Sequence, residues 1–329
     1  MRAALLSLIV LILGIVPVAA RGDLGHPRYR LDATSSFDPY AGETAWIKAH
    51  VNLIHGYGSF AREHYVAKGF PTIDYHDPST EGYAPLTPAN RARYMQKVEA
   101  DKAQGFLGVA NDDINFSLGF RDGNQNKASY EPEAKELGLL IEQERKFWPT
   151  AIIETNTQWH DLSGRLSDPN VQRMIANSSL IYKEFGVGPT SGITTRADWE
   201  ALRLFDWHLQ WEGKGIVYGG DYGSNTVQAN EYTLATELYS THGHDQYSTA
   251  GKYELPPTWW TGSDVDLGLP EGYFFCEAGY CVRLFSAGIV YLVQPGGPTH
   301  TFPVFGCSVE WGCPIAVTLH ERQGAVFVE

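Results

Sequence analysis

Phe106-Leu-Gly-Val-Ala-Asn-Asp-Asp-Ile-Asn-Phe116 is the stretch of sequence that decides the predicted fold. Its first half is apolar and uncharged, which is typical of a strand buried on both faces of a parallel sheet. The stretch then turns polar at Asn111, Asp112 and Asp113. A carboxylate pair at the C-terminal end of such a strand lies where α/β barrels place their chemistry. An isolated pair can also simply cap the next segment, so the interpretation depends on how the other strands end.

Seven further segments with strand character accompany this one. With it, the predicted strands are residues 29–32, 50–55, 71–76, 106–112, 150–156, 179–185, 215–221 and 244–247. Helical patterns separate several of them, at residues 87–104, 131–146, 170–177, 196–211 and 231–242. Strands alternating with helices predict a parallel sheet, and eight strands predict closure into an α/β (β/α)8 TIM barrel. An open doubly wound sheet is the alternative, but no Gly-x-Gly-x-x-Gly follows an early strand.

The residue composition and pattern of the sequence change towards the C-terminus. Residues 280–294 and 316–328 are rich in β-forming residues, and Pro295-Gly-Gly-Pro298 is typical of a tight turn between strands. The predicted organisation is therefore a signal peptide at 1–20, a barrel at 21–262 and a small antiparallel β-subdomain at 263–329.

The first twenty residues resemble a secretory signal peptide. Arg2 precedes an unbroken apolar run, and small residues at Val18 and Ala20 suit cleavage after position 20. An uncleaved anchor is the alternative, although the run is short for a full span. The expected location is secreted or periplasmic, without an integral membrane segment after cleavage.

Net charge and cysteine content restrict the binding partners and the cellular compartment that are expected for the chain. The net charge is −13 and no Lys/Arg cluster is present, which argues against nucleic acid or an anionic membrane as partner. All four cysteines fall late in the chain, at Cys276, Cys281, Cys307 and Cys313. In an exported chain this predicts two disulfides of unassigned pairing. A zinc site with four thiolates is the alternative, but the spacings are looser than those of usual zinc knuckles.

Four of the predicted strands end in acids, at Asp112/Asp113, Glu154, Glu184 and Asp221. Because the C-terminal ends of barrel strands face the same side, these acids are expected to converge on one cleft. Glycoside hydrolysis needs two carboxyl groups, one as acid and the other as nucleophile or base. Crowded acids also raise one another's pKa, which suits the acid role.

Polar and aromatic residues close to these strand ends are candidates for substrate binding. Trp159 offers a stacking surface, and other side chains can contact hydroxyl groups; the full set is Tyr75, His76, Asn156, Trp159, His160 and Asp221. No cofactor-binding motif appears, so no cofactor and no metal ligand are expected for this cleft.

Three motifs in this order resemble the glycoside-hydrolase-like barrel families related to the α-galactosidase and endo-galactosaminidase superfamily. They are Gly-Val-Ala-Asn-Asp-Asp-Ile-Asn, Ile-Glu-Thr-Asn-Thr-Gln-Trp-His-Asp and Tyr-Lys-Glu-Phe-Gly-Val, followed by Phe-Ser-Ala-Gly-Ile-Val-Tyr-Leu-Val-Gln-Pro in the β-subdomain. The resemblance implies Asp112 as nucleophile or base and Glu184 as general acid, with Glu154 holding substrate or tuning a neighbour. Ala110-Asn111 departs from the larger apolar residues of these families, which leaves open whether Asp112 or Asp113 faces the cleft.

The functional hypothesis is an exported glycoside hydrolase acting on a poly- or oligosaccharide. A non-catalytic carbohydrate-binding barrel is the alternative from another class. A third possibility is a metal-dependent hydrolase built on His242, His244 and Asp245, although clustered histidines are common in loops. The sugar, the linkage, the stereochemical outcome and the oligomeric state are not predicted.

Overall fold

The protein is described by a computed structural model. The structure describes residues 28–33, 44–78, 81–83, 85–114, 116, 127–157, 164–183, 186–189, 192–219, 226–241, 246–250, 264–308 and 311–329.

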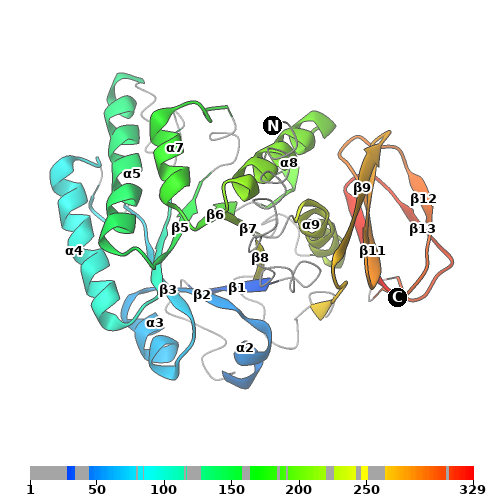
Figure 1. Ribbon diagram of the computed structural model, residues 1–329, viewed down its shortest axis with the longest axis horizontal. Helices are drawn as coiled ribbons and strands as arrows, with labels where there is room; N and C mark the ends of the chain where they lie inside the picture. The colour runs from blue at the N-terminus through cyan, green and yellow to red at the C-terminus, as the bar shows by residue number, and fades with distance from the viewer. Residues whose placement is uncertain are drawn as a thin grey trace, which may run out of the picture.

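Eight parallel strands form a closed barrel in the order of the sequence (Figure 1). β1 pairs with β2 on one side and with β8 on the other, which closes the sheet. The strands are β1 Arg28–Ala33, β2 Leu53–Gly56, β3 Thr72–His76, β4 Gly108–Asn111, β5 Ile152–Asn156, β6 Leu180–Lys183, β7 Gly215–Tyr218 and β8 Gln246–Ala250. Each overlaps a segment predicted as a strand, so the α/β TIM barrel is confirmed.

Helices surround the barrel, with α4, α5, α7 and α8 arranged along its outside in Figure 1. Their bounds are α2 Thr44–His50, α3 Gly58–His64, α4 Pro88–Gln104, α5 Lys127–Phe147, α7 Pro169–Asn177, α8 Arg196–Trp211 and α9 Val227–Ser240, with a 3-10 turn η2 at Val66–Lys68. The five predicted helices are all present. The sequence pattern did not predict α2 or α3.

Local sequence signals explain where α4 begins and ends. The side chain of Thr87 accepts a hydrogen bond from the Asn90 amide, and Pro88 occupies the first turn, where its missing N–H costs nothing. Gly105 ends the helix with a φ of 91°, a conformation that glycine adopts without strain. Tyr94 and Val98 of this helix are completely buried in the core.

The start of β4 requires glycine for a different reason. A Cβ added at Gly108 would lie 1.8 Å from the carbonyl oxygen of Ile152 on the neighbouring strand. Any side chain would therefore force β4 and β5 apart, just before the strand reaches Asp112.

Two apolar layers hold the barrel together. A small cluster fills its interior and consists of Leu53, Ile73, Ala110, Leu180, Tyr182 and Val217, with Ile152 packed against it. A larger cluster joins the outer faces of the strands to the helices, including Val109, Ile153, Ile181 and Ile216. The two sets alternate along β2, β4, β5, β6 and β7, and this alternation fixes which polar side chains point inwards.

The C-terminal region forms antiparallel sheets beside the barrel, as Figure 1 shows. One sheet has the strand order β14-β11-β10-β9 and the other pairs β12 with β13; their bounds are β9 Pro270–Glu277, β10 Tyr280–Phe285, β11 Gly288–Val293, β12 His300–Pro303, β13 Ala316–Leu319 and β14 Gln323–Val328. A second core that includes Tyr291, Phe302 and Phe327 joins the two sheets. The predicted antiparallel β-region is confirmed.

The four cysteines form two disulfides, Cys276–Cys281 and Cys307–Cys313. The prediction of two disulfides is therefore confirmed, and the alternative of a zinc site with four thiolates is wrong. The first disulfide joins neighbouring positions of β9 and β10, which pair directly. Both therefore link segments close in sequence within the C-terminal region.

Within the described ranges, no helix has the length and apolarity that a membrane span requires. The predicted signal peptide at 1–20 lies outside the described residues.

Candidate active site

The inward-facing polar residues follow from the strand alternation. Ile73 lies in the barrel interior, so Tyr75, two residues later on β3, has the same orientation. On β5 the same step leads from Ile152 to Glu154 and then to Asn156. On β4 it leads from Ala110 to Asp112, immediately after the strand ends.

The carboxylate of Asp112 accepts three hydrogen bonds. The Tyr75 hydroxyl donates to Oδ2 at 2.5 Å, and the Asn156 side-chain amide donates to Oδ1 at 2.6 Å. The backbone N–H of Asp113 also donates to Oδ1, at 2.8 Å. Three donors on two oxygens suit an ionised carboxylate, which can only accept. The neighbouring strands β3 and β5 thus fix the group at the end of β4.

The backbone holds Asp112 as firmly as the side chains do. Its N–H donates to the carbonyl of His76 at 2.8 Å, which continues the β3–β4 pairing past the last strand residue. The N–H of Ile114 donates to the carbonyl of Asn156 at 3.0 Å. Between these two anchors Asp113 adopts a φ of 53°, in the left-handed region that Asp tolerates better than most residues.

Tyr75 is held in its protonated form. Burial and the adjacent negative charge of Asp112 raise the pKa of its hydroxyl far above the usual value. The hydroxyl therefore keeps its proton at every physiological pH and remains a donor to Asp112. The ring of Tyr57, which is 45% exposed, lies 5.9 Å from the Tyr75 ring and adds a second aromatic surface there.

A buried charged layer lies beneath Asp112 in the barrel. Arg30 and Glu154 are almost fully buried, with 3.2 Å between Nε and Oε2. His55 Nδ1 lies 3.6 Å from Glu154 Oε1 and also contacts the Arg30 guanidinium. That guanidinium lies 4.1 Å from the centre of the Tyr182 ring. The cation and the carboxylate balance each other's charge inside the barrel.

These two layers are continuous. The His55 ring lies 5.2 Å from the Tyr75 ring, so contacts run from Asp112 through Tyr75 and His55 to Glu154. The arrangement offers one fixed carboxylate near the end of the barrel and a charge-balanced layer below it. Such a carboxylate can act as a nucleophile or as a general base.

The sequence-predicted site residues other than His76 divide into three groups. Asp112, Asn156 and Tyr75 come together, and Glu154 lies in the layer below them, within reach of His55. Asp113 follows Asp112 and binds it through its backbone N–H. The remaining candidates Trp159, His160, Glu184 and Asp221, and the alternative cluster His242, His244 and Asp245, lie outside the described residues.

His76 needs a correction. It was predicted to contact substrate beside Tyr75, but it lies on the outer face of β3 and its Nε2 lies 2.7 Å from Asp101 on α4. Adjacent strand residues point to opposite faces, so Tyr75 and His76 belong to different environments. With 1% of its surface exposed, His76 is enclosed between the barrel and a helix.

Sequence reasoning missed Arg30, His55, Tyr57 and Tyr182 as parts of the site. The signal was present for Arg30, because a charge between apolar neighbours in a barrel strand needs a buried partner. His55 occupies the same parity as Leu53 in β2, and Tyr182 the same parity as Leu180 in β6. Counting that alternation in every strand would have identified both.

Comparison with known proteins gives a likeness of fold. No protein-family model matches the chain, and no curated protein matches it. Similar solved structures include the glycoside hydrolase domain of PelA from Pseudomonas aeruginosa, at 15% identity over 69% of this chain and 96% of that chain, with a TM-score of 0.46.

A xylanase of glycoside hydrolase family 30, Xyn30A from Clostridium acetobutylicum, is similar at 12% identity over 94% of this chain and 97% of that chain, with a TM-score of 0.47. The GH36 α-galactosidase AgaA A355E from Geobacillus stearothermophilus is similar at 10% identity over 94% of this chain and 57% of that chain, with a TM-score of 0.43. Several of these neighbours are glycoside hydrolases. Aldolases also occur among them, so the likeness does not distinguish one reaction from another.

Proposed function

We propose that the protein is a glycoside hydrolase that cleaves a poly- or oligosaccharide with a pair of carboxyl groups. The observation that carries the proposal is the carboxylate of Asp112, held by Tyr75, Asn156 and a backbone N–H immediately after β4. This is the end of a barrel at which catalytic groups gather. Asp112 acts as the nucleophile, or as the base that activates water.

Fixed donors suit this role because they orient the attacking oxygen. Tyr75 and Asn156 keep both carboxylate oxygens in place in the free protein, so little reorganisation is needed when substrate arrives. Tyr57 would offer its exposed ring to a sugar face.

The proposal assigns Glu184 as the general acid. In the sequence it follows Leu180 and Tyr182 at the two-residue period of the inward-facing positions of β6. Glu154 is assigned to tuning rather than proton transfer, because Arg30 neutralises it inside the barrel. Trp159, His160 and Asp221 are assigned to substrate contacts on the basis of the sequence alone.

A mechanism that uses a nucleophilic lysine finds less support on the barrel strands than one that uses carboxyl groups. The eight barrel strands, all of which are described, carry a single lysine, Lys183. It points outwards, where its Nζ lies 2.6 Å from both carboxylate oxygens of Asp206 on α8. A nucleophilic lysine on a barrel strand, as Schiff-base chemistry requires, would have to face the interior.

The remaining parts of the proposal concern processing and organisation. Residues 1–20 would direct export and be removed, leaving a catalytic unit at 21–262 and a β-subdomain at 263–329. The two disulfides are compatible with a secreted or periplasmic location. A carbohydrate is the expected partner, with no cofactor in the cleft.

The test is release of reducing ends from a broad panel of microbial and plant polysaccharides by the exported protein. We expect release from at least one substrate, and loss of that release in Asp112→Asn and in Glu184→Gln. Both variants should still bind the substrate, because each amide keeps the shape of the carboxyl group. Binding of a glycan without release of reducing ends from any substrate in the panel would favour the carbohydrate-binding alternative instead.

A further inference from the structure

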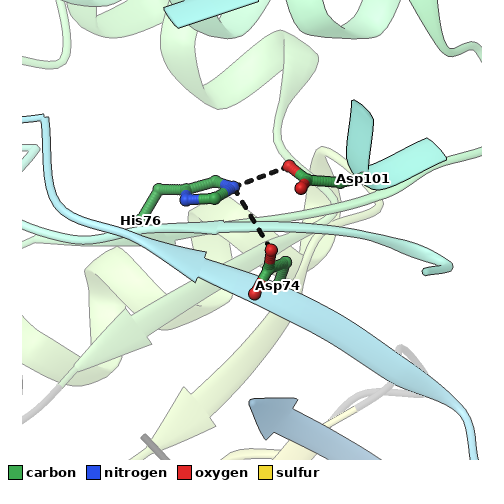
Figure 2. A group of neighbouring side chains, drawn as sticks. All are labelled: Asp74, His76 and Asp101. Carbon is green, nitrogen blue, oxygen red and sulfur yellow. Dashed lines mark hydrogen bonds and ion pairs between the residues drawn. The ribbon is translucent and has the colours of Figure 1, made fainter. Parts of the chain in front are cut away.

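Two carboxylates and an imidazole meet between β3 and α4, on the outer side of the barrel. Asp74 and His76 share the outward face of β3, and Asp101 comes from the facing side of α4 (Figure 2). Their exposed fractions are 2%, 1% and 3%, so all three are closed off from solvent. This cluster is separate from Asp112, which belongs to the inward-facing set.

The spacing of the three side chains fits a metal ion. His76 Nε2 lies 2.7 Å from Asp101 Oδ2 and 3.8 Å from Asp74 Oδ2, and one ligand atom of each residue lies within 4.8 Å of the others. Bonds from zinc to nitrogen or carboxylate oxygen are about 2.0–2.2 Å long, so one ion bridges atoms up to about 4.2 Å apart. Both distances from Nε2 lie within that limit, and the separation between the two carboxylate oxygens, at most 4.8 Å, is close to it.

A second ring of contacts orients the ligands. The other imidazole nitrogen, Nδ1, makes no hydrogen bond among the described residues but faces Glu81 Oε1 at 3.7 Å. Glu81 is in turn bound by Lys97. The Gly58 N–H donates to Asp74 Oδ1 at 2.7 Å, which leaves Oδ2 turned towards His76. Metal-binding histidines are commonly oriented by a carboxylate on the second nitrogen in this way.

The charge of the cluster points to a divalent cation. Asp74 and Asp101 bring two negative charges into a buried space, and the nearby Lys97 is already paired with Glu81. A divalent ion beside a neutral imidazole would balance the two carboxylates completely. Without an ion, an imidazolium balances only one of the two carboxylates, and the other must either keep a proton or carry an uncompensated charge in the protein interior.

We propose that Asp74, His76 and Asp101 bind one divalent transition-metal ion, with zinc as the representative probe. One imidazole nitrogen with two carboxylate oxygens suits zinc or manganese, whereas magnesium and calcium prefer oxygen ligands alone. From the sequence alone, no metal ligand is predicted here and His76 is expected in the cleft. The ion would fasten α4 to β3 behind Tyr75, and the carbonyl of His76 accepts the Asp112 N–H.

The experiment uses the purified full chain with its disulfides intact, stripped of metal by chelator. Zn²⁺ is titrated by calorimetry, and metal content and thermal midpoint are measured after removal of excess ion. We expect one tightly bound equivalent and a rise in the midpoint. His76→Gln and Asp101→Asn should each weaken binding by at least about 10- to 100-fold, the range that even second-ring changes produce.

A matched control separates this cluster from ordinary surface histidines. His50 Nε2 lies 3.8 Å from Asp264 Oδ2, but that pair is partly exposed. Asp264→Asn should therefore leave the tight equivalent unchanged. The titration of the wild-type chain tests by itself whether the ion binds, so the proposal stays testable even if a variant folds poorly.

Two results would overturn the proposal. The first is a wild-type chain that binds neither Zn²⁺ nor Mn²⁺ tightly and shows no shift in midpoint, in which case the cluster is a proton-sharing network. The second is a bound equivalent that persists in both His76→Gln and Asp101→Asn, which would show an adventitious ion only. Neither readout depends on enzymatic activity, so the outcome is independent of the proposed function.

Discussion

Individual side chains of the site are set by their neighbours on adjacent strands. Asp112 would be an ordinary carboxylate at a strand end without the hydroxyl of Tyr75 and the amide of Asn156. Tyr75 in turn keeps its proton because burial and the charge of Asp112 raise its pKa far above the usual value. Tyr75 and Asn156 thus fix the position of the Asp112 carboxylate, and the charge of Asp112 helps to keep Tyr75 protonated.

Tyr75→Phe should lower kcat about 10- to 100-fold with little change in KM. The substitution removes one hydrogen bond to a charged group, worth about 1.5–3 kcal/mol, and keeps the ring. Steady-state kinetics on the substrate found in the panel would measure it. Tyr57→Phe is the control, since the Tyr57 ring is exposed and contacts Asp112 through no hydrogen bond in the described part of the chain. Equal effects of the two changes would show that the Tyr75 hydroxyl has no special role.

Glu154→Gln should destabilise the fold by about 3–5 kcal/mol, because Arg30 would remain buried without its counter-charge. Denaturant unfolding of the variant measures the loss. Glu200→Gln is the control, as Glu200 and its partner Arg196 are about half exposed, and it should cost less than about 1 kcal/mol. A loss from Glu154→Gln as small as that of the control would contradict the buried pair.

At the scale of helices and strands, a polar network joins β4 to the helices outside it. Asn111 points outwards, accepts from the Tyr94 hydroxyl of α4 at 2.5 Å and donates to Glu144 of α5 at 3.0 Å. Burial raises the pKa of Glu144 to about 8, against the opposing effect of the Asn111 hydrogen bond. The helices are therefore fastened to the strand that ends in Asp112.

The wild-type protein should lose stability as pH rises, and Glu144→Gln should remove that loss. The unfolded Glu144 ionises near its usual pKa of 4.5, whereas the folded one keeps its proton up to about 8. The unfolded state therefore binds fewer protons in this window, and wild-type stability falls as pH increases. The variant cannot ionise, so its melting temperature should match wild type near pH 4 and exceed it at pH 8.

Thermal melts of both proteins from pH 4 to pH 8 provide the measurement. Glu142→Gln is a control of opposite sign, because the Lys146 hydrogen bond lowers the pKa of Glu142. That stabilisation is present above the unfolded pKa and is lost as pH falls. A difference between Glu144→Gln and wild type that does not change with pH would refute the raised pKa.

The sequence predicted long periodic elements well and side-chain direction less well. Apolar runs such as residues 106–110 identify buried strands because few other structures hide so many apolar residues in a row. The short helices α2 and α3 have one buried residue each, Ile47 and Ala61, so no pattern could reveal them. Tyr75 and His76 are adjacent polar residues in the sequence, but they point to opposite faces of β3, so only the strand alternation separates their environments.

At the scale of the whole molecule, the C-terminal sheets are joined to the barrel through α9. Glu231 of α9 is buried and accepts from Trp311 Nε1 at 3.0 Å and from the Val326 N–H at 3.2 Å. Arg283 of β10 donates to the carbonyls of Leu238 and Tyr239 near the end of the same helix. The sequence placed a β-region here but gave no sign of these contacts, which join residues far apart in the chain.

Trp311→Phe should destabilise this junction by about 1.5–3 kcal/mol, because the buried carboxylate of Glu231 would lose a donor. Denaturant unfolding measures the change, and it is followed by far-ultraviolet circular dichroism because that signal does not rely on tryptophan fluorescence. Trp211→Phe is the matched control, since Trp211 is 80% exposed and the change should stay within about 0.5 kcal/mol. Indistinguishable midpoints for the two variants would argue against the Glu231 contact.

A comparison of Asp112 with its neighbour Asp113 tests the proposed catalytic role of Asp112. Reducing-end release from the best substrate is measured for wild type, Asp112→Asn and Asp113→Asn. Asn tolerates the left-handed backbone at position 113, so both variants should fold. We expect Asp112→Asn to lower the rate at least about 100-fold, as loss of an acid–base group does, while Asp113→Asn keeps most of the activity. Full activity in Asp112→Asn, or loss only in Asp113→Asn, would contradict it.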